Sequence, residues 1–575
     1  MTEYSAENLL QFKIVSCMEK VLPWREPSAE GAQVRLSGLK GETVSFQIAY
    51  RWDGFRKSRG KIGYEIQNLS GVSVRIRTVG LSPCAYPCHP QRDDDYLDTR
   101  PGMFPDLLQD LKGNGFPLVA GQWRSLWIDL EIGEGADAGD GTVTFTIKGK
   151  EDTGKDAELS YGCLTVGLKV IGARLPALRI PHTEWFHCDC LANYYGLDVF
   201  SERHWEVIET FVKTAVKRGC NTLLTPLFTP PLDTAFGGER RTVQLVDVKE
   251  KAPGEYAFSF EKLKRWVEMG RRCGITWFEM SHLFSQWGAK YAPKIVGERN
   301  GSVQQLFGWD TDAAGEPYRI FLHAFLDALL AELDQLGIRD CTFFHLSDEP
   351  GEKDYASYLA AKELVKEKLK GCRLIETLSS YDFYEKGLIE EPICGTDHLE
   401  PFLEEGRRPE KLWAYYCTVQ CVDVSNRFIA MPGYRTRILG TQLYKYAIDG
   451  FLHWGYNFYN SEYSLFPIDP YACTDADGAF PSGDSFLVYP GPGGQPEESI
   501  RLMLMDEAMA DLRAMDFLES LTDRQTVLGC LEEESSRPLT FRSYPRSTSY
   551  IAKVRERVNE AICRAVGTQA DKTIG

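Results

Sequence analysis

The sequence lacks the glycine-rich motifs with which many proteins bind nucleotide phosphates. Neither GxxxxGK[ST] nor a GxGxxG motif after a strand occurs in the 575 residues. No stretch approaches the roughly 18 uncharged apolar residues of a membrane helix. The N-terminus, MTEYSAENLLQFKIVSCMEK, lacks the basic and then apolar regions of a secretory signal. We therefore expect no nucleotide-dependent chemistry and a cytoplasmic location.

Positive charge is also scarce. The chain has 65 basic and 82 acidic residues, a net charge of −17. Such a surface repels phosphate backbones and anionic lipid, so we expect no nucleic-acid partner and no membrane partner. The composition, 43% hydrophobic and 26% charged, is that of a globular protein. The length predicts two or three domains, because it exceeds what one hydrophobic core usually serves.

The 16 cysteines follow no disulfide framework. Cys84 lies close to Cys88, and Cys188 lies close to Cys190. Neither pair has a second Cys/His pair at zinc-finger spacing, so we expect no metal site. Free thiols in a reducing compartment are the simpler interpretation, and no motif indicates a cofactor.

The first part of the chain, residues 1–178, is predicted to be an antiparallel β-sandwich. Its segments are rich in β-branched and aromatic residues, and several alternate apolar with polar positions, as half-buried strands do. Turn-forming residues separate them, and long helical periods are absent. The expected strands include 43–50, 73–79, 124–130, 141–147 and 163–171.

Beyond the proline-containing stretch 172–181 the pattern changes. Short apolar runs alternate with longer amphipathic stretches, which indicates repeated βα units. Eight such runs favour a (β/α)8 TIM-type barrel over residues 179–525, with a doubly wound sheet as the alternative. The rest, 526–575, is expected to be largely helical. The runs are 184–189, 221–226, 276–282, 341–348, 373–378, 393–398, 412–417 and 450–456.

Polar and aromatic residues gather where these runs end. In a barrel the active site forms at the C-terminal ends of the strands, so this gathering predicts one pocket. Any single residue could instead be a core group with a satisfied hydrogen bond. The candidate substrate-binding residues are His187, Asp189, Glu279, His282, His345, Asp397, Trp413, Tyr415, Tyr416, Trp454, Tyr456 and Asp484.

The sharpest local signal is FFHLSDEP, in which the fourth run leads directly into Asp348 and Glu349. Two adjacent acids before a proline are often no more than a helix-start feature. Here they occupy a pocket-forming position, so we predict that they are the catalytic carboxyls.

Aromatic residues are abundant, with 12 Trp, 27 Tyr and 30 Phe. The C–H faces of sugar rings stack on aromatic rings, and sugar hydroxyls need polar partners, so the mixture suits a carbohydrate site. Core packing remains the preferred interpretation for Trp185 and Trp277. The long segment 460–495 is typical of a functional loop. Within it, Asp484 either reaches the substrate or serves a turn.

Five segments follow one another along the chain, EWFHCDCLANYYG, TPLFTPPLDT, SDEP, HWGYNFY and GDSFLVYPG. Together they resemble glycoside hydrolase family 123 and the related "domain of unknown function 4091" proteins. The resemblance implies an exo-acting β-N-acetylgalactosaminidase. It also implies that Glu349 is the general acid and that Asp348 orients the 2-acetamido group of the substrate. An oligosaccharide or glycoconjugate would then be the partner.

Two other functions stay open at this point. A conventional retaining glycosidase would pair Glu349 with a second carboxylate, such as Glu279, Glu376 or Asp397. A carbohydrate-binding protein with a decayed site would have lost its acids, and the intact Asp348–Glu349 pair argues against that alternative. The sugar, the linkage and the oligomeric state do not follow from the sequence.

Overall fold

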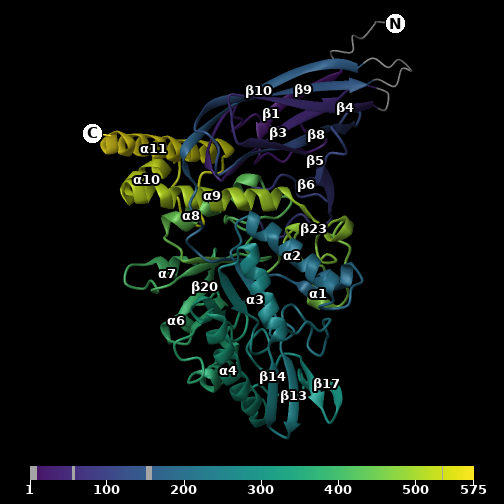
Figure 1. Cartoon of the computed structure of the whole chain (residues 1–575), viewed down its shortest axis with the longest axis vertical. Coiled ribbons are helices and arrows are strands. Elements are labelled where there is room, and N and C mark those ends of the chain that lie inside the picture. The colour runs from purple at the N-terminus through teal and green to yellow at the C-terminus, as the bar shows by residue number, and fades with distance from the viewer. Residues whose placement is uncertain (1–8, 55–57, 151–157, 534, 575) are drawn as a thin grey trace. The chain divides into compact units, whose positions relative to one another are not determined.

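The computed structural model describes residues 9–54, 58–150, 158–533 and 535–574 (Figure 1). The chain forms two compact units. One comprises residues 1–179, 425–445 and 497–575, and the other comprises residues 180–424 and 446–496. The predicted domain limits, 178 and 525, stay predictions. No described helix is long and apolar enough to cross a membrane.

The first unit holds two five-stranded sheets, as the N-terminal pattern predicts. One has the strand order β1-β3-β8-β5-β6 and the other β2-β10-β9-β4-β7. Every strand pair in them is antiparallel except β10 with β2. The strands are β1 (Leu10–Ser16), β2 (Arg35–Lys40), β3 (Thr43–Trp52), β4 (Ser58–Gln67), β5 (Val72–Cys84), β6 (Gly102–Asp110), β7 (Gly115–Leu118), β8 (Trp123–Ile132), β9 (Gly139–Lys150) and β10 (Glu158–Arg174).

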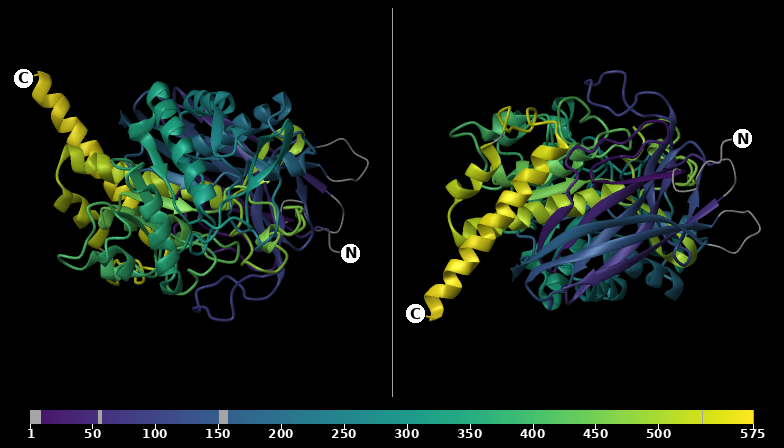
Figure 2. Two further views of the ribbon diagram at one scale, coloured as in Figure 1. Left: turned by 90° about the horizontal axis from the view of Figure 1, so that it is seen from below. Right: turned by 90° about the horizontal axis from the view of Figure 1, so that it is seen from above.

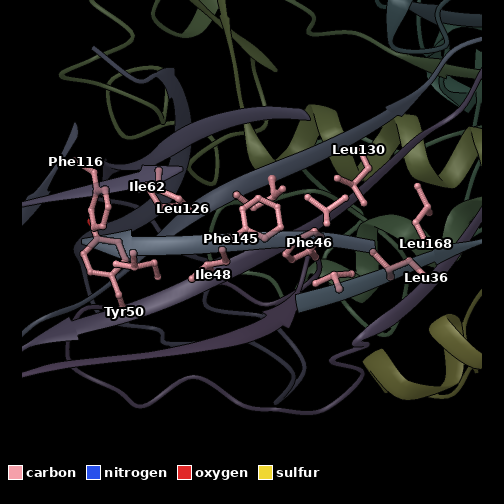
Figure 3. Packing of buried hydrophobic residues seen from close by; sticks show 14 of the residues in the cluster. Leu36, Phe46, Ile48, Tyr50, Ile62, Phe116, Leu126, Leu130, Phe145 and Leu168 are labelled. Carbon is pink, nitrogen blue, oxygen red and sulfur yellow. The ribbon is translucent and has the colours of Figure 1, made fainter. Parts of the chain in front are cut away.

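The two sheets enclose an apolar core, which Figure 3 shows. Phe46 meets Phe145 edge to face at 5.8 Å, and Tyr50 meets Phe116 at 4.9 Å. Alternation along each strand sends these side chains inward and their neighbours outward. The same unit contains α8 (Gly433–Lys445), α9 (Ile500–Leu521), α10 (Arg524–Glu532) and the long α11 (Thr548–Ile574), which leads to the C-terminus in Figure 2.

The second unit contains a closed barrel of eight parallel strands, in the order β11-β12-β15-β18-β19-β20-β21-β22. The (β/α)8 prediction is therefore confirmed, and the open-sheet alternative is wrong. The barrel strands are β11 (His182–Glu184), β12 (Thr222–Thr225), β15 (Trp277–Met280), β18 (Thr342–Phe344), β19 (Arg373–Leu378), β20 (Glu391–Gly395), β21 (Trp413–Tyr415) and β22 (Gly450–His453).

Helices follow the first six barrel strands within this unit. Ser201 caps α2 as predicted, because its hydroxyl accepts the N–H of His204 at 3.3 Å. The helices are α1 (Cys188–Tyr194), α2 (Glu202–Lys217), α3 (Glu261–Cys273), α4 (Glu316–Leu336), α5 (Tyr355–Val365), α6 (Tyr381–Glu385) and α7 (Glu400–Leu403).

The loops after the second and third barrel strands carry a four-stranded sheet of their own, in the order β14-β13-β16-β17. Its strands are β13 (Asp247–Ala252), β14 (Glu255–Ser259), β16 (Ile295–Arg299) and β17 (Ser302–Phe307). Two short strands come late in the chain, β23 (Val488–Pro490) and β24 (Pro496–Glu498).

Candidate active site

A pocket is formed by residues at or beyond the C-terminal ends of the barrel strands. Seven of the eight strands, or the loops after them, contribute to its lining, as the barrel architecture predicts. The lining residues are Trp185, His187, Leu232, Asp233, Gln286, Trp287, Asp348, Glu349, Thr377, Tyr415, Cys417, Thr418, Leu452, Trp454, Phe458 and Phe480.

The two predicted catalytic carboxyls both lie in this pocket. Adjacent residues of a regular strand point to opposite faces, but β18 ends at Phe344 and the backbone turns before Asp348. Glu349 has a left-handed backbone with φ of +44°, a strained conformation for a residue other than glycine. This turn lets neighbouring side chains share one cavity, and both are half-buried.

One hydroxyl ties the two residues together. Thr377, in β19, donates to Asp348 Oδ1 at 2.6 Å and accepts the backbone N–H of Glu349 at 3.1 Å. Across the pocket, the Tyr415 hydroxyl donates to Glu349 Oε1 at 2.7 Å. Each carboxyl therefore has a fixed orientation before any substrate enters.

The surroundings favour the protonated forms of this pair. Burial, followed by the charge of Glu349, raises the pKa of Asp348 to about 8. Burial and the charge of Asp397 raise the pKa of Glu349, and the Tyr415 hydroxyl opposes that rise. Two such carboxyls titrate as a unit, so the pair keeps a proton at pH values where a solvated carboxyl has lost it. One ionised and one protonated carboxyl is the state that acid–base catalysis requires.

Thr377 is expected to be a positioning residue. Thr377→Val keeps the side-chain shape but removes both hydrogen bonds, so we expect kcat to fall about 10- to 100-fold with a smaller change in KM. Thr377→Ser retains the hydroxyl and should keep most of the activity. Steady-state kinetics of the two variants test this expectation, and equal losses in both would contradict it.

A buried carboxylate, Asp484, fixes the aromatic side chain of Trp454 in the pocket lining. Trp454 donates its indole N–H to Asp484 Oδ2 at 3.0 Å, and Asp484 also lies 3.2 Å from His453 Nε2. Asp484 is fully buried and does not line the pocket. It therefore orients Trp454, while the long loop 460–495 brings Phe480 to the lining, 5.3 Å from the Trp454 ring.

His187 lines the pocket as a neutral imidazole. The buried Arg240 bonds both carboxylate oxygens of Asp189, at 2.8 and 2.9 Å, and lies 3.1 Å from His187 Nδ1. Burial and the Arg240 charge lower the pKa of His187 to about 4. Its Nδ1 therefore accepts from the guanidinium, and its Nε2–H donates to the Trp454 carbonyl at 2.8 Å. Asp189 lies behind this contact, outside the pocket lining.

Two other predicted residues, Glu279 and His345, form a buried network with Glu376 in the barrel interior. Glu279 accepts hydrogen bonds from Thr183 at 2.6 Å, Trp185 at 2.7 Å and His345 at 2.6 Å. The second nitrogen of His345, Nδ1, lies 3.9 Å from Glu376. These two carboxylates raise the pKa of His345 to about 9, against the effect of its burial. The cation of this network is the protonated imidazole of His345, which is buried and does not line the pocket.

His282 stacks on His345, with ring centroids 4.5 Å apart. Neither of its ring nitrogens has a hydrogen-bond partner among the residues described, and burial lowers its pKa well below the usual value. Ligand atoms of His282, His345 and Glu376 lie within 4.8 Å of one another. Because of its lowered pKa, His282 is a neutral interior group. It is absent from the pocket lining.

The remaining predicted residues also lie away from the lining. Trp413 packs in the barrel interior, and Tyr416 packs against Phe451 and His453. Tyr456 donates its hydroxyl to the Phe211 carbonyl at 3.1 Å. Asp397 accepts from Gln420 at 2.9 Å and lies 2.8 Å from His398. Of the fourteen predicted site residues, the pocket thus brings together His187, Asp348, Glu349, Tyr415 and Trp454.

Several lining residues were not predicted as site residues. Trp185, which was assigned to the core, both lines the pocket and bonds Glu279. Asp233, Gln286 and Trp287 lie in loops well beyond the strand ends, where strand periodicity gives no signal. Asp233 does stand within TPLFTPPLDT, one of the five segments that resemble a known family.

A model of the glycoside hydrolase 123 catalytic domain matches residues 185–518, more than half of the 575 residues. The chain belongs to glycoside hydrolase family 123. The match begins at Trp185, just after the first barrel strand, and includes every residue of the pocket lining. The family assignment makes the protein a glycoside hydrolase.

One solved structure of a family 123 enzyme has the same fold as this chain. A structure of a family 123 glycoside hydrolase from Clostridium perfringens, described in terms of glycolipid glycan hydrolysis, has a TM-score of 0.73 and 12% identity. It covers 99% of this chain and 100% of its own. A maltogenic α-amylase from Thermotoga neapolitana covers 59% of this chain and 77% of its own, at 11% identity and a TM-score of 0.30. A search of curated protein sequences finds no match.

Proposed function

We propose that this family 123 enzyme is an exo-acting, retaining hydrolase that releases β-linked N-acetylgalactosamine or a related 2-acetamido sugar. The observation that carries the proposal is the joint fixing of Asp348 and Glu349 by Thr377 in one pocket. The partner would be the terminal sugar of an oligosaccharide or glycoconjugate. The resemblance noted in the sequence supports the same substrate class.

The proposed chemistry uses the substrate's own amide as nucleophile. Asp348 accepts the acetamido N–H, which favours its ionised form and leaves the shared proton on Glu349. The acetamido oxygen attacks the anomeric carbon as the glycosidic C–O bond breaks, and Glu349 delivers its proton to the leaving oxygen. Glu349 then accepts a proton from water, which opens the cyclic oxazolinium with net retention.

The placement of three acids, Glu279, Glu376 and Asp397, argues against a conventional carboxylate pair that includes one of them. Glu279 and Glu376 are buried and already accept hydrogen bonds, and Asp397 is held by Gln420. None of the three lines the pocket. Adjacent Asp348 and Glu349 cannot easily flank a glycosidic bond from two sides. A nucleophile supplied by the substrate removes that requirement.

The test is a panel of aryl glycosides with and without a 2-acetamido group. We expect turnover only of the 2-acetamido substrates, with retained anomeric configuration by NMR, and strong inhibition by a thiazoline analogue of the cyclised sugar. Efficient cleavage of a plain β-galactoside, or trapping of a glycosyl-enzyme by a 2-fluoro sugar, would favour the conventional mechanism. Binding of these sugars without any turnover would favour a carbohydrate-binding protein.

A further inference from the structure

The loop after β12 carries a third carboxyl to the pocket. Asp233 is half-buried and lines the same cavity as Asp348 and Glu349. Its backbone is left-handed, with φ of +39°, a conformation that costs free energy for an aspartate. Such strain persists only where the surrounding structure over-determines the conformation, and it gathers at functional sites.

Three hydrogen bonds hold Asp233 in this conformation. Its N–H donates to Gln286 Oε1 at 2.6 Å, and its carbonyl accepts from the Ser464 hydroxyl at 2.6 Å. Its Oδ2 accepts the N–H of Tyr463 at 3.1 Å. Tyr463 and Ser464 are themselves left-handed, each with φ of +55°. Three residues with left-handed backbones, Asp233, Tyr463 and Ser464, thus bind one another, and these contacts fix the Asp233 carboxylate.

The second carboxylate oxygen, Oδ1, has no hydrogen-bond donor among the described residues. Within the described part of the chain Asp233 forms no salt bridge, and the nearby Arg240 is paired with Asp189. Burial raises the pKa of Asp233 to about 6, although the Tyr463 N–H and the Arg240 charge oppose this rise. A carboxylate that accepts but cannot donate, in a pocket lined by aromatic rings, is suited to hydroxyl donors.

The side chain of Asp233 and the side chains that fix the two catalytic carboxyls come from different strands and loops. Gln286, which bonds Asp233, precedes Trp287, whose N–H donates to the Asp348 carbonyl at 2.9 Å. Asp233 therefore belongs to the wall built by the loops after β12 and β15. Glu349 instead reaches Tyr415 in β21, and Asp348 reaches Thr377 in β19.

We propose that Asp233 binds the hydroxyl at C4 or C6 of the terminal sugar and is a specificity-determining residue. The inference rests on the proposed function, in which the catalytic pair engages C1 and the substituent at C2. The hydroxyls at C4 and C6 are furthest from those two positions on the ring. One of them can then donate to Oδ1 of Asp233, which lines the same pocket on the loop after β12.

The test is a cycle of enzyme variants and deoxygenated substrates. Wild type and Asp233→Asn are compared on an aryl β-N-acetylgalactosaminide and on its 4-deoxy and 6-deoxy analogues. Wild type should lose about 10- to 100-fold in kcat/KM with one analogue, the usual range for a hydrogen bond to a charged group. The kcat/KM of Asp233→Asn on the parent sugar should be lower than that of wild type by a similar factor. Its kcat/KM values for the parent and for that analogue should differ by less than about threefold.

A matched control is Asp477→Asn, which alters an exposed acid of the loop 460–495 that does not line the pocket. Asp477→Asn should behave as wild type. Full retention of the wild-type discrimination by Asp233→Asn would overturn the proposal. So would a loss of about 10³-fold or more in kcat on all substrates that azide restores, because that result identifies a nucleophile.

The outcome is separable from that of the proposed function. If wild type cleaves plain β-galactosides as well as 2-acetamido sugars, the 2-acetamido requirement fails. The same cycle is then run on the plain galactoside and its deoxy analogues, and it still decides the role of Asp233. If wild type turns over neither class, the cycle is run on binding of the free sugars by calorimetry, with the same expected pattern.

Discussion

Glu349→Gln should lower kcat on a 2-acetamido aryl glycoside by about 10²- to 10⁴-fold, the contribution usual for general acid–base catalysis. Glutamine keeps the side-chain shape and can still accept the Tyr415 hydroxyl, which lies 2.7 Å from Glu349 Oε1. It cannot protonate the leaving oxygen. The loss should therefore be large for a poor leaving group such as methylumbelliferone and much smaller for a dinitrophenol, which departs without a proton.

Asp348→Asn should behave differently, with a loss of about 10²- to 10³-fold that is similar for both leaving groups. Asparagine can still accept from Thr377, but it carries no charge to stabilise the developing oxazolinium. The matched control is Glu352→Gln, an exposed acid three residues after Glu349 that does not line the pocket. If the loss in kcat depended on the leaving group for Asp348→Asn and not for Glu349→Gln, the two assigned roles would be exchanged.

The barrel could be predicted because most of its strands stand out as short apolar runs between longer amphipathic stretches. All eight predicted runs coincide at least in part with a barrel strand. The first was placed two residues late. The strand β11 is His182–Glu184, and α1 begins at Cys188, so the apolar run in the sequence is largely loop. Thr183 points to Glu279 inside the barrel, and a polar interior residue gives no apolar signal.

The site was predicted less completely than the fold, for reasons that the strand geometry explains. Tyr415 and Tyr416 are adjacent, so the chain sends one ring to the pocket and the other to Phe451 and His453. Trp413 shares the side of Tyr415 but lies one layer deeper, among interior apolar residues. Proximity to a strand end thus indicates a site, but the direction and depth of each side chain decide whether that residue lines the pocket.

Thr377 illustrates what single-residue patterns miss. Within RLIETL it is an ordinary strand-forming residue. Its hydroxyl acquires a role only because β18 lies beside β19 and ends where Asp348 can reach it. That relation depends on strand order and register, which the composition of neither strand encodes. Asp233 and Gln286 depend likewise on two loops that meet in space.

His345→Gln should cause the largest loss of stability among the variants considered. His345 is fully buried, with Glu279 at 2.6 Å and Glu376 at 3.9 Å. Removing the cation leaves two buried carboxylates uncompensated, and breaking a buried pair in this way costs about 3–5 kcal/mol. We expect a clear drop in the urea midpoint of unfolding. His282→Gln, at the stacked neutral neighbour, is the control and should cost less.

The pH dependence of that loss distinguishes a lost charge from a packing defect. The carboxylates raise the pKa of His345 from 6.5 to about 9, so the folded state binds its proton more tightly than the unfolded state. The stabilisation is fully present below about pH 6.5 and is lost as pH rises through about 9. The difference in unfolding free energy between wild type and His345→Gln should therefore shrink between pH 6 and pH 9.5. A difference in unfolding free energy that stays constant over this range would assign the effect to packing alone. In that case the loss of unfolding free energy in the double variant Glu279→Gln/His345→Gln would be at least the sum of the losses in the two single variants.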